Sequence, residues 1–117
     1  MSRRLLFSFR HAFRGFWYMV LKERNFRIEV IVGILVLLIA FLLKMEKWEI
    51  TAIIFAIFSV LILEAINTLV ERLVNIFKPR IHPYAKMLKD VTASIVLIGS
   101  VGAALIGIVI FWSYVFG

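Results

Sequence analysis

The chain has 117 residues, of which 63% are hydrophobic and only 18% are charged, and it carries a net charge of +7 and no cysteine. Soluble domains average about 45–50% apolar and about 25% charged residues, so this composition, with a mean hydropathy of +1.01, excludes an ordinary soluble domain and predicts a membrane protein. The absence of cysteine excludes a disulfide scaffold, a thiolate nucleophile and a cysteine-ligated metal site.

The N-terminal segment, about residues 3–22, combines basic and apolar side chains at helical spacing. Leu5, Phe9 and Trp17 belong to one helical face, and Arg10 and Arg14 lie on the other. The arginines interrupt every apolar run, which argues against a signal peptide. The pattern therefore predicts an amphipathic helix in the membrane interface, with its arginines towards anionic headgroups. The alternative is a helix packed on a soluble core.

Three hydrophobic segments follow, and we predict that they cross the membrane at about residues 28–44, 48–71 and 90–113. A spanning helix needs about 20 residues. The third segment has that length uninterrupted, and the first two reach it through flanks such as Phe26 and Trp48. The apolar runs also lack the alternation of barrel strands. The predicted fold is all-α: a single integral membrane domain, residues 1–117, with one surface helix and three transmembrane helices.

Basic residues set the predicted topology, because lysine and arginine are retained on the cytoplasmic side. Seven lie in the first 27 residues and five lie between Arg72 and Lys89, whereas residues 44–49 have two basic and two acidic side chains. We expect a multi-pass protein of the cytoplasmic (inner) membrane, with its N-terminus inside, its C-terminus outside, and a solvated outer turn at 44–49. Pro79 and Pro83 predict an interruption within the inner loop, residues 72–89. This topology already explains the positive charge, so we expect no nucleic-acid partner.

Small residues recur in the third predicted span. Gly99, Ala103 and Gly107 stand at i, i+4 and i+8, a spacing that lets helices approach closely. The neighbouring helix is either another span of the same chain or a second copy, and the sequence leaves both open.

A charged residue inside a membrane is costly, and Glu64 is the clearest case, because fourteen uncharged residues precede it. Counted from Trp48 at about 1.5 Å per residue, Glu64 lies about 24 Å into a hydrocarbon layer of about 30 Å, near its inner boundary. The same helical face carries the polar residues at i+3, i+4, i+7 and i+11, which are Asn67, Thr68, Glu71 and Asn75. A polar strip therefore leads from Glu64 towards the cytoplasm.

Other polar residues converge on the same membrane level in this topology. They are Glu23 and Glu29 before the first span, and Lys86, Lys89 and Asp90 before the third. Carboxylate and amide oxygens favour a hard cation such as Mg²⁺, and magnesium suggests a phosphorylated partner. Glu71 would pair with a carboxylate such as Glu23 to hold the metal, and Glu64 would act as a base, while the lysines neutralise phosphate charge.

Two other functions fit part of this pattern. The polar residues could simply join helices to one another. A proton or ion pathway would need polar residues across the whole membrane, but residues 50–63 offer only Thr51 and Ser59. The sequence therefore favours a catalytic site at the inner interface.

The most specific motif is Glu64-Ala-Ile-Asn67-Thr68-Leu-Val-Glu71, which follows the pattern E-x-x-N-[ST]-x-x-E. It is supported by Glu23-Arg-Asn-Phe26-Arg27 and by the block from His82 to Val91. With these blocks, from about Arg4 to the end of the third span, the chain resembles the small prokaryotic membrane lipid kinases, the diacylglycerol kinase and undecaprenol kinase family.

The resemblance implies a role for each matching residue. Glu64 would be the general base for a lipid hydroxyl, and Asn67 would orient the reacting groups. Glu23 and Glu71 would hold the Mg²⁺ that bridges ATP phosphates. The nucleotide contacts would be Lys89, Asp90, His82 and Arg4, and the lipid contacts would be Glu29, Arg27 and Glu64. The resemblance further implies a homotrimer whose active sites lie between subunits.

The chain departs from the family pattern at Leu69, where a small residue is usual, and at Asn75, where aspartate is usual. Since every residue assigned to the chemistry remains, we expect an active enzyme, and the alternative is a catalytically silent relative that acts as a membrane interaction protein. Undecaprenol and diacylglycerol both offer a primary hydroxyl, so the sequence does not identify the lipid. Residues 25–27 and 82–89 favour the undecaprenol branch.

Overall fold

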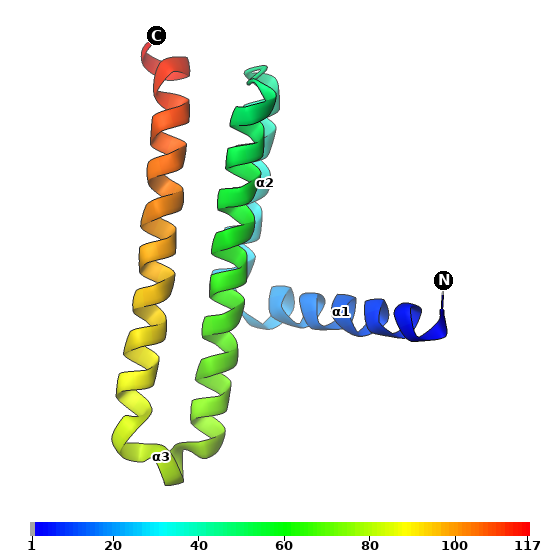
Figure 1. Ribbon diagram of the computed structural model, residues 1–117, viewed down its shortest axis with the longest axis vertical. Helices are drawn as coiled ribbons and strands as arrows, with labels where there is room; N and C mark the ends of the chain where they lie inside the picture. The colour runs from blue at the N-terminus through cyan, green and yellow to red at the C-terminus, as the bar shows by residue number, and fades with distance from the viewer. Residues whose placement is uncertain (1) are drawn as a thin grey trace.

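The computed structural model describes residues 2–117, and this part of the chain is all-helical, as the sequence predicts. The helices are α1 (Arg3–Lys22), α2 (Arg24–Leu42) and α3 (Lys47–Phe116). Figure 1 shows α2 and the two halves of α3 running side by side, while α1 projects sideways from them. The chain therefore forms a bundle of three helical rods that lie side by side, with one transverse helix.

The helix α3 folds back on itself at Ile81, whose backbone angles of φ −110° and ψ 17° are not helical. Pro79 and Pro83 flank this residue, and each removes a backbone N–H and crowds the preceding turn. We call residues 47–80 the first arm of α3 and residues 82–116 the second arm; they run antiparallel in Figure 1. The interruption that the two prolines predict is therefore confirmed at Ile81, while the residues of the inner loop on either side of it are helical.

A single extended residue, Glu23, joins α1 to α2. The Arg27 guanidinium donates hydrogen bonds to the carbonyl oxygens of Val20 at 3.1 Å and Leu21 at 3.4 Å. These carbonyls belong to the last turn of α1 and have no partner within that helix. Phe16 of α1 also packs edge-on against Phe26 of α2, with ring centroids 5.8 Å apart. Both contacts fix the direction in which α1 leaves the bundle.

The turn between α2 and α3 closes through two backbone bonds. The Met45 N–H donates to Ala40 at 3.2 Å and the Lys44 N–H donates to Phe41 at 3.1 Å, the pairing of a Schellman motif. Lys44 occupies the left-handed position with φ +55°, where glycine is usual. Met45 and Ala40 are buried here in the core cluster of the bundle, together with Ile53 and Ile110.

Glu49 corrects the expectation of a wholly solvated turn at residues 44–49. Its side chain is buried, accepts a hydrogen bond from the hydroxyl of Tyr114, and accepts the Glu46 N–H at 3.0 Å. The expectation was wrong for Glu49 because the sequence does not show that the C-terminal turn of α3 returns to this point. The contact joins the two arms at the end far from Ile81.

Gly99 explains how closely the two arms of α3 pack. A Cβ atom at Gly99 would lie 2.1 Å from Cδ1 of Leu63, which is far inside ordinary contact. The sequence left open whether the small residues Gly99, Ala103 and Gly107 pack against another span of the same chain or against a second copy. At Gly99 the contact is within the chain. Ala103 and Gly107 instead border an open groove between α2 and α3.

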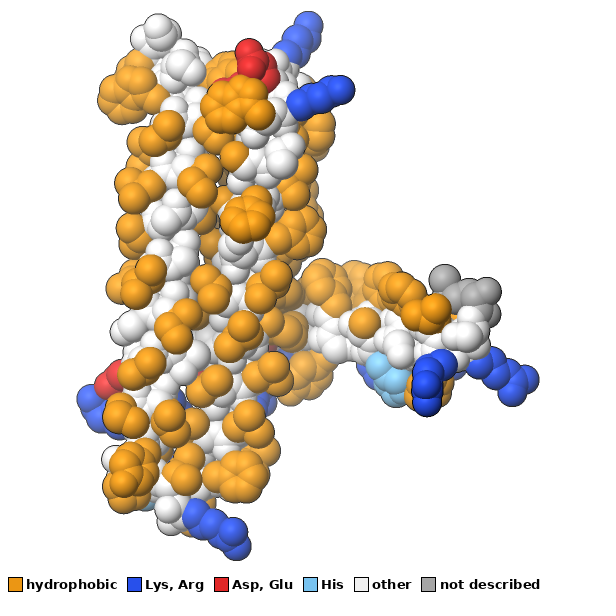
Figure 2. Space-filling view, in the orientation of Figure 1, with side chains coloured by type: hydrophobic (Ala, Val, Ile, Leu, Met, Phe, Trp, Pro, Cys, Tyr) orange, Lys and Arg blue, Asp and Glu red, His pale blue; other side chains and the backbone are white. Residues whose placement is uncertain are grey.

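Large hydrophobic side chains cover the outside of the bundle, as Figure 2 shows along the arms of α3. No large side chain among residues 2–117 is fully buried, whereas Leu42 is 81% exposed and Phe55 72% exposed. Both α2 and α3 are long and apolar enough to cross a membrane. A soluble protein rarely exposes an apolar surface of this extent, so the bundle suits a lipid environment.

Candidate active site

Four carboxylates gather where α1, α2 and the first arm of α3 meet. Glu23 lies between α1 and α2, Glu29 lies in the second turn of α2, and Glu64 and Glu71 lie on the first arm. Glu64 is within electrostatic range of Glu23, Glu29 and Glu71. We call these four residues the carboxylate cluster, and the sequence predicted that they lie at one level.

The deep part of the cluster contains polar atoms without partners. Glu64 and Thr68 are each 7% exposed. The Oε2 atom of Glu29 and the Oδ1 atom of Asn67 are buried, and no described residue donates a hydrogen bond to them. An unsatisfied buried acceptor costs about 1–3 kcal/mol, so such atoms in a native protein require an explanation. A ligand that brings a hydroxyl or a cation would satisfy them.

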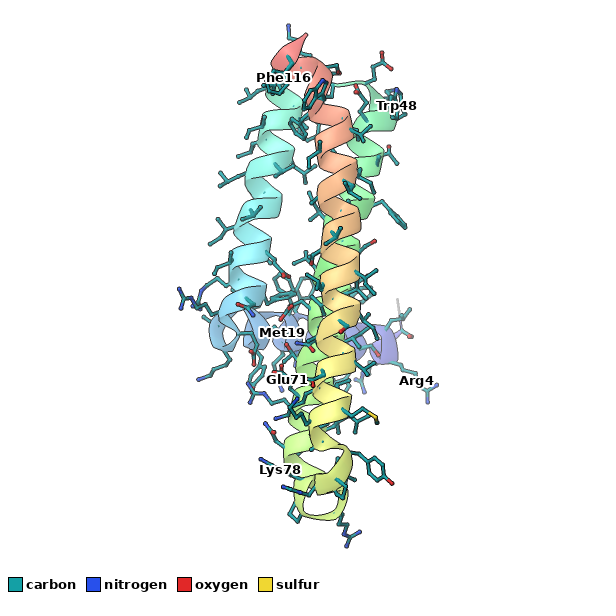
Figure 3. All side chains as sticks on the ribbon, turned by 90° about the vertical axis from the view of Figure 1, so that its left-hand side faces the viewer. Arg4, Met19, Trp48, Glu71, Lys78 and Phe116 are labelled. Carbon is teal, nitrogen blue, oxygen red and sulfur yellow. The ribbon has the colours of Figure 1, made fainter. Side chains whose placement is uncertain are left out.

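The polar strip on the first arm is ordered by one contact. The Nδ2 atom of Asn67 donates to Oε1 of Glu71 at 3.4 Å, one helical turn away. The contact is long for a hydrogen bond, yet it holds the Asn67 side chain along the strip. Figure 3 shows Glu71 near the end of α1 that carries Met19, which agrees with a site at the junction of the helices.

Arg72 is a member of the site that the sequence reasoning missed. Its guanidinium forms an ion pair with the Glu23 carboxylate, 49 positions away in the chain, and it lies within electrostatic range of Glu71. The Arg72 side chain is 52% exposed, so the pair contributes little to stability. Its consequence is local: one positive charge stands beside two of the carboxylates. The only indication in the sequence is that Arg72 directly follows Glu71.

The oxygen atoms of the cluster fit a magnesium ion that is shared with phosphate. Mg²⁺ commonly takes one or two protein carboxylates, with waters and substrate phosphates as its other ligands. Glu23 and Glu71, which both lie within electrostatic range of Arg72, are the candidates for such a pair. Within residues 2–117 there is no group of three or more side chains arranged as a closed metal cage. The donors therefore suit a hard cation that arrives with a phosphorylated ligand.

The second arm contributes Lys89, whose Nζ atom donates to Oδ1 of Asn75 on the first arm at 2.8 Å. Asn75 is one of the departures from the family pattern, and here it contacts a residue predicted to bind nucleotide. Asp90 instead pairs with Lys86 at 3.1 Å on an exposed surface. The structure thus brings Lys89 to the first arm but leaves Asp90 facing solvent.

Three further predicted residues do not join the cluster within one chain. His82 is exposed at the turn between the arms. Arg4 lies near the N-terminal end of α1, which projects away from the bundle (Figures 1 and 3). Arg27, predicted to contact lipid, holds the last carbonyls of α1 instead.

Comparison with known proteins identifies the family to which the chain belongs. The family described as prokaryotic diacylglycerol kinase matches residues 10–111. An undecaprenol kinase of Bacillus subtilis is 36% identical over 104 residues, covering 89% of this chain and 85% of that protein. A diacylglycerol kinase of Synechocystis is 36% identical over 104 residues, covering 88% and 59%. One of Helicobacter pylori is 30% identical over 96 residues, covering 82% and 68%. The chain therefore belongs to the prokaryotic diacylglycerol kinase family.

Proposed function

We propose that the chain is a membrane lipid kinase that transfers the γ-phosphoryl group of ATP to the hydroxyl of a lipid alcohol, undecaprenol or diacylglycerol. One observation carries the proposal: four carboxylates from the α1–α2 link, α2 and α3 converge at one end of an apolar bundle, and a buried oxygen atom of Glu29 and one of Asn67 have no hydrogen-bond donor among the described residues. A lipid hydroxyl and a phosphate-bound cation are the ligands that such a site lacks.

In the proposed reaction, Glu64 is the general base and Asn67 the positioning residue. The lipid hydroxyl donates its proton to the Glu64 carboxylate while its oxygen attacks the γ-phosphorus. A new O–P bond forms, the bond to the β-phosphate oxygen breaks, and ADP leaves. Phosphoryl transfer depends mainly on positioning and on neutralising charge, so a small rigid site suffices.

Glu23 and Glu71 would hold Mg²⁺, which when bound offsets negative charge on the phosphates. Lys89 would add a positive charge, and Asp90 would contact the nucleotide from the second arm. His82 and Arg4 lie apart from the cluster of their own chain, so in this proposal they reach nucleotide through association of subunits. This arrangement supports a homotrimer whose active sites are shared between neighbours.

The proposed setting is the cytoplasmic membrane, with α2 and the two arms of α3 as three spans. In Figure 2 the hydrophobic side chains of α1 lie along its upper side and the basic ones along its lower side, which supports a helix lying in the inner interface. The N-terminus would be inside and the C-terminus outside. In Figure 3, Trp48 and Phe116 mark the end assigned to the outer face, and Lys78 lies near the other end.

The test is transfer of labelled phosphate from Mg·ATP to undecaprenol and to diacylglycerol in mixed micelles. Glu64→Gln keeps the side-chain shape and removes the base, so we expect transfer to fall by about 10²–10⁴-fold. Glu46→Gln is the matched control, because it removes a carboxylate at the opposite end of the bundle. A folded native protein that transfers phosphate to neither lipid would instead identify a catalytically silent relative that acts as an interaction protein.

A further inference from the structure

Lys89 is held across the two arms of α3 by a neutral partner. Its Nζ atom donates a hydrogen bond to Oδ1 of Asn75 at 2.8 Å, 14 positions earlier in the chain. Lys89 is also the only lysine in residues 2–117 that is half-buried, since the other five are exposed. Its ammonium group therefore has a defined place, whereas an exposed lysine samples many positions on its flexible stem.

The positive charge of Lys89 is not cancelled within the chain. The neighbouring acid, Asp90, pairs with Lys86 at 3.1 Å instead. One other ion pair is present in residues 2–117, and Lys89 does not belong to it. The amide oxygen of Asn75 carries only a partial negative charge. The contact between Lys89 and Asn75 thus positions a full positive charge without neutralising it.

This ammonium group is held close to the carboxylate cluster. Asn75 lies four residues after Glu71 on the same face of the first arm, about 6 Å further along the helix axis. Glu71 is a proposed ligand of the metal that binds nucleotide phosphates, so Asn75 places the Lys89 ammonium group about one helical turn from that metal ligand. Both arms are packed at this level, because Val74 is 3% exposed and Ala85 6% exposed. The packing holds the backbone on each side of the contact.

A carboxylate at position 75 would act differently. Aspartate, which is usual here in the family pattern, has the size of asparagine and would form an ion pair with Lys89. An incoming phosphate would then have to displace the carboxylate, and the same carboxylate would repel the phosphate. An exposed ion pair shifts such an equilibrium by up to about fivefold. Asn75 holds the lysine without either effect.

We infer that Asn75 is a positioning residue, which holds the Lys89 ammonium group for the nucleotide phosphates and leaves its full charge available to them. The inference rests on the proposed function, because it takes Lys89 to contact phosphate. It gives the departure from the family pattern at position 75 a consequence: this chain binds nucleotide more tightly with asparagine than it would with aspartate.

The first experiment measures the dissociation constant of Mg·ADP by isothermal titration calorimetry in micelles, without a lipid alcohol. Asn75→Asp keeps the acceptor and pairs the charge, so we expect the Kd to rise about fivefold at low salt and less than about twofold at about 0.5 M salt. Asn75→Ala removes the acceptor and leaves the charge unpaired, so we expect a rise of about threefold at both salt concentrations. An unchanged or lower Kd in Asn75→Asp would overturn the inference.

The second experiment asks whether the effect of Asn75 depends on Lys89. Lys89→Met keeps the apolar stem and removes the ammonium group, so adding Asn75→Ala to it should leave the Kd for Mg·ADP unchanged. Lys86→Met is the matched background, because it removes a charge one turn away that pairs with Asp90 and does not contact Asn75. We expect Asn75→Ala to keep its threefold effect there. The same effect in both backgrounds would overturn the inference.

The transfer assay separates the inference from the proposed function. Asn75→Asp should raise the KM for ATP and leave the KM for the lipid alcohol unchanged, whereas a merely structural role would change both. Phosphate transfer with an unchanged KM for ATP in both Asn75 variants would overturn only the inference. A native protein that binds Mg·ADP with the expected variant pattern but transfers no phosphate would refute only the proposed function. A native protein that binds no Mg·ADP would refute both.

Discussion

The ion pair between Arg72 and Glu23 makes a sharp prediction about the metal. If Glu23 and Glu71 hold Mg²⁺, the Arg72 guanidinium repels that cation and occupies one of its ligands. Replacing Arg72 with glutamine keeps a hydrogen-bond donor, on a shorter side chain, and removes the positive charge. Arg72→Gln should therefore lower the Mg²⁺ concentration that gives half-maximal activity.

The size of this effect follows from the exposure of Arg72. Its side chain is 52% exposed, so the dielectric constant of water applies. For unit charges about 5 Å apart, Coulomb's law then predicts that the repulsion weakens binding of a monovalent cation about fourfold. For a divalent cation the same repulsion weakens binding about sixteenfold. Screening at physiological ionic strength, with a Debye length of about 8 Å, reduces the factor to about fivefold. We therefore expect about a fivefold shift, which should shrink further as salt is added.

The assay measures the rate of phosphoryl transfer as a function of free Mg²⁺ concentration at saturating ATP. A separate titration with paramagnetic Mn²⁺ measures metal binding without turnover. Arg80→Gln is the matched control, because it removes the same charge from the same arm about 12 Å further along the helix, beyond the Debye length. A larger Mg²⁺ requirement in Arg72→Gln would refute the reasoning, since it would mean that Arg72 orients Glu23 for the metal. Equal shifts in the two variants would also refute the reasoning, because the effect would then come from the net charge of the protein.

Two further predictions concern the end of the bundle opposite the site, and both are measured by thermal unfolding in detergent followed by circular dichroism. Tyr114→Phe removes the hydroxyl that donates to the buried Glu49 carboxylate, so the Tm should fall by about 5 °C, while Glu49→Gln combined with Tyr114→Phe should add little further loss. Additive losses would mean that the two side chains do not depend on each other. Lys44→Gly relieves the left-handed backbone at φ +55° and should stabilise the fold by about 0.5–1 kcal/mol, raising the Tm by about 2–5 °C. A lower Tm would show that the side chain of Lys44 contributes more than its backbone costs.

The sequence predicted those parts of the protein that depend on local periodicity. The strip from Glu64 to Glu71 follows from the helical repeat alone, because residues three, four and seven positions apart share a face whatever packs against them. The all-helical fold followed in the same way from long apolar runs without the alternation of strands. The membership of Glu23 and Glu29 in the cluster followed from their positions just before a predicted span and at its start.

Tertiary structure decided the partners of these residues, because partners that are distant in the chain leave no periodic signal. Arg72 meets Glu23 only because α1 and α2 join beside the first arm, and Tyr114 meets Glu49 only because α3 reverses at Ile81. Arg27, which the resemblance assigned to the lipid, holds the end of α1, since unpaired carbonyls at a helix end attract a nearby guanidinium.

The groove is the clearest case of what the sequence could not show. The spacing of Gly99, Ala103 and Gly107 predicted close packing, and this is what Gly99 provides against Leu63. Eight residues further along the same stripe, Gly107 faces open space, because α2 and the two arms do not close completely around it. A small residue permits either contact or emptiness, and only the arrangement of the neighbouring helices determines which one results.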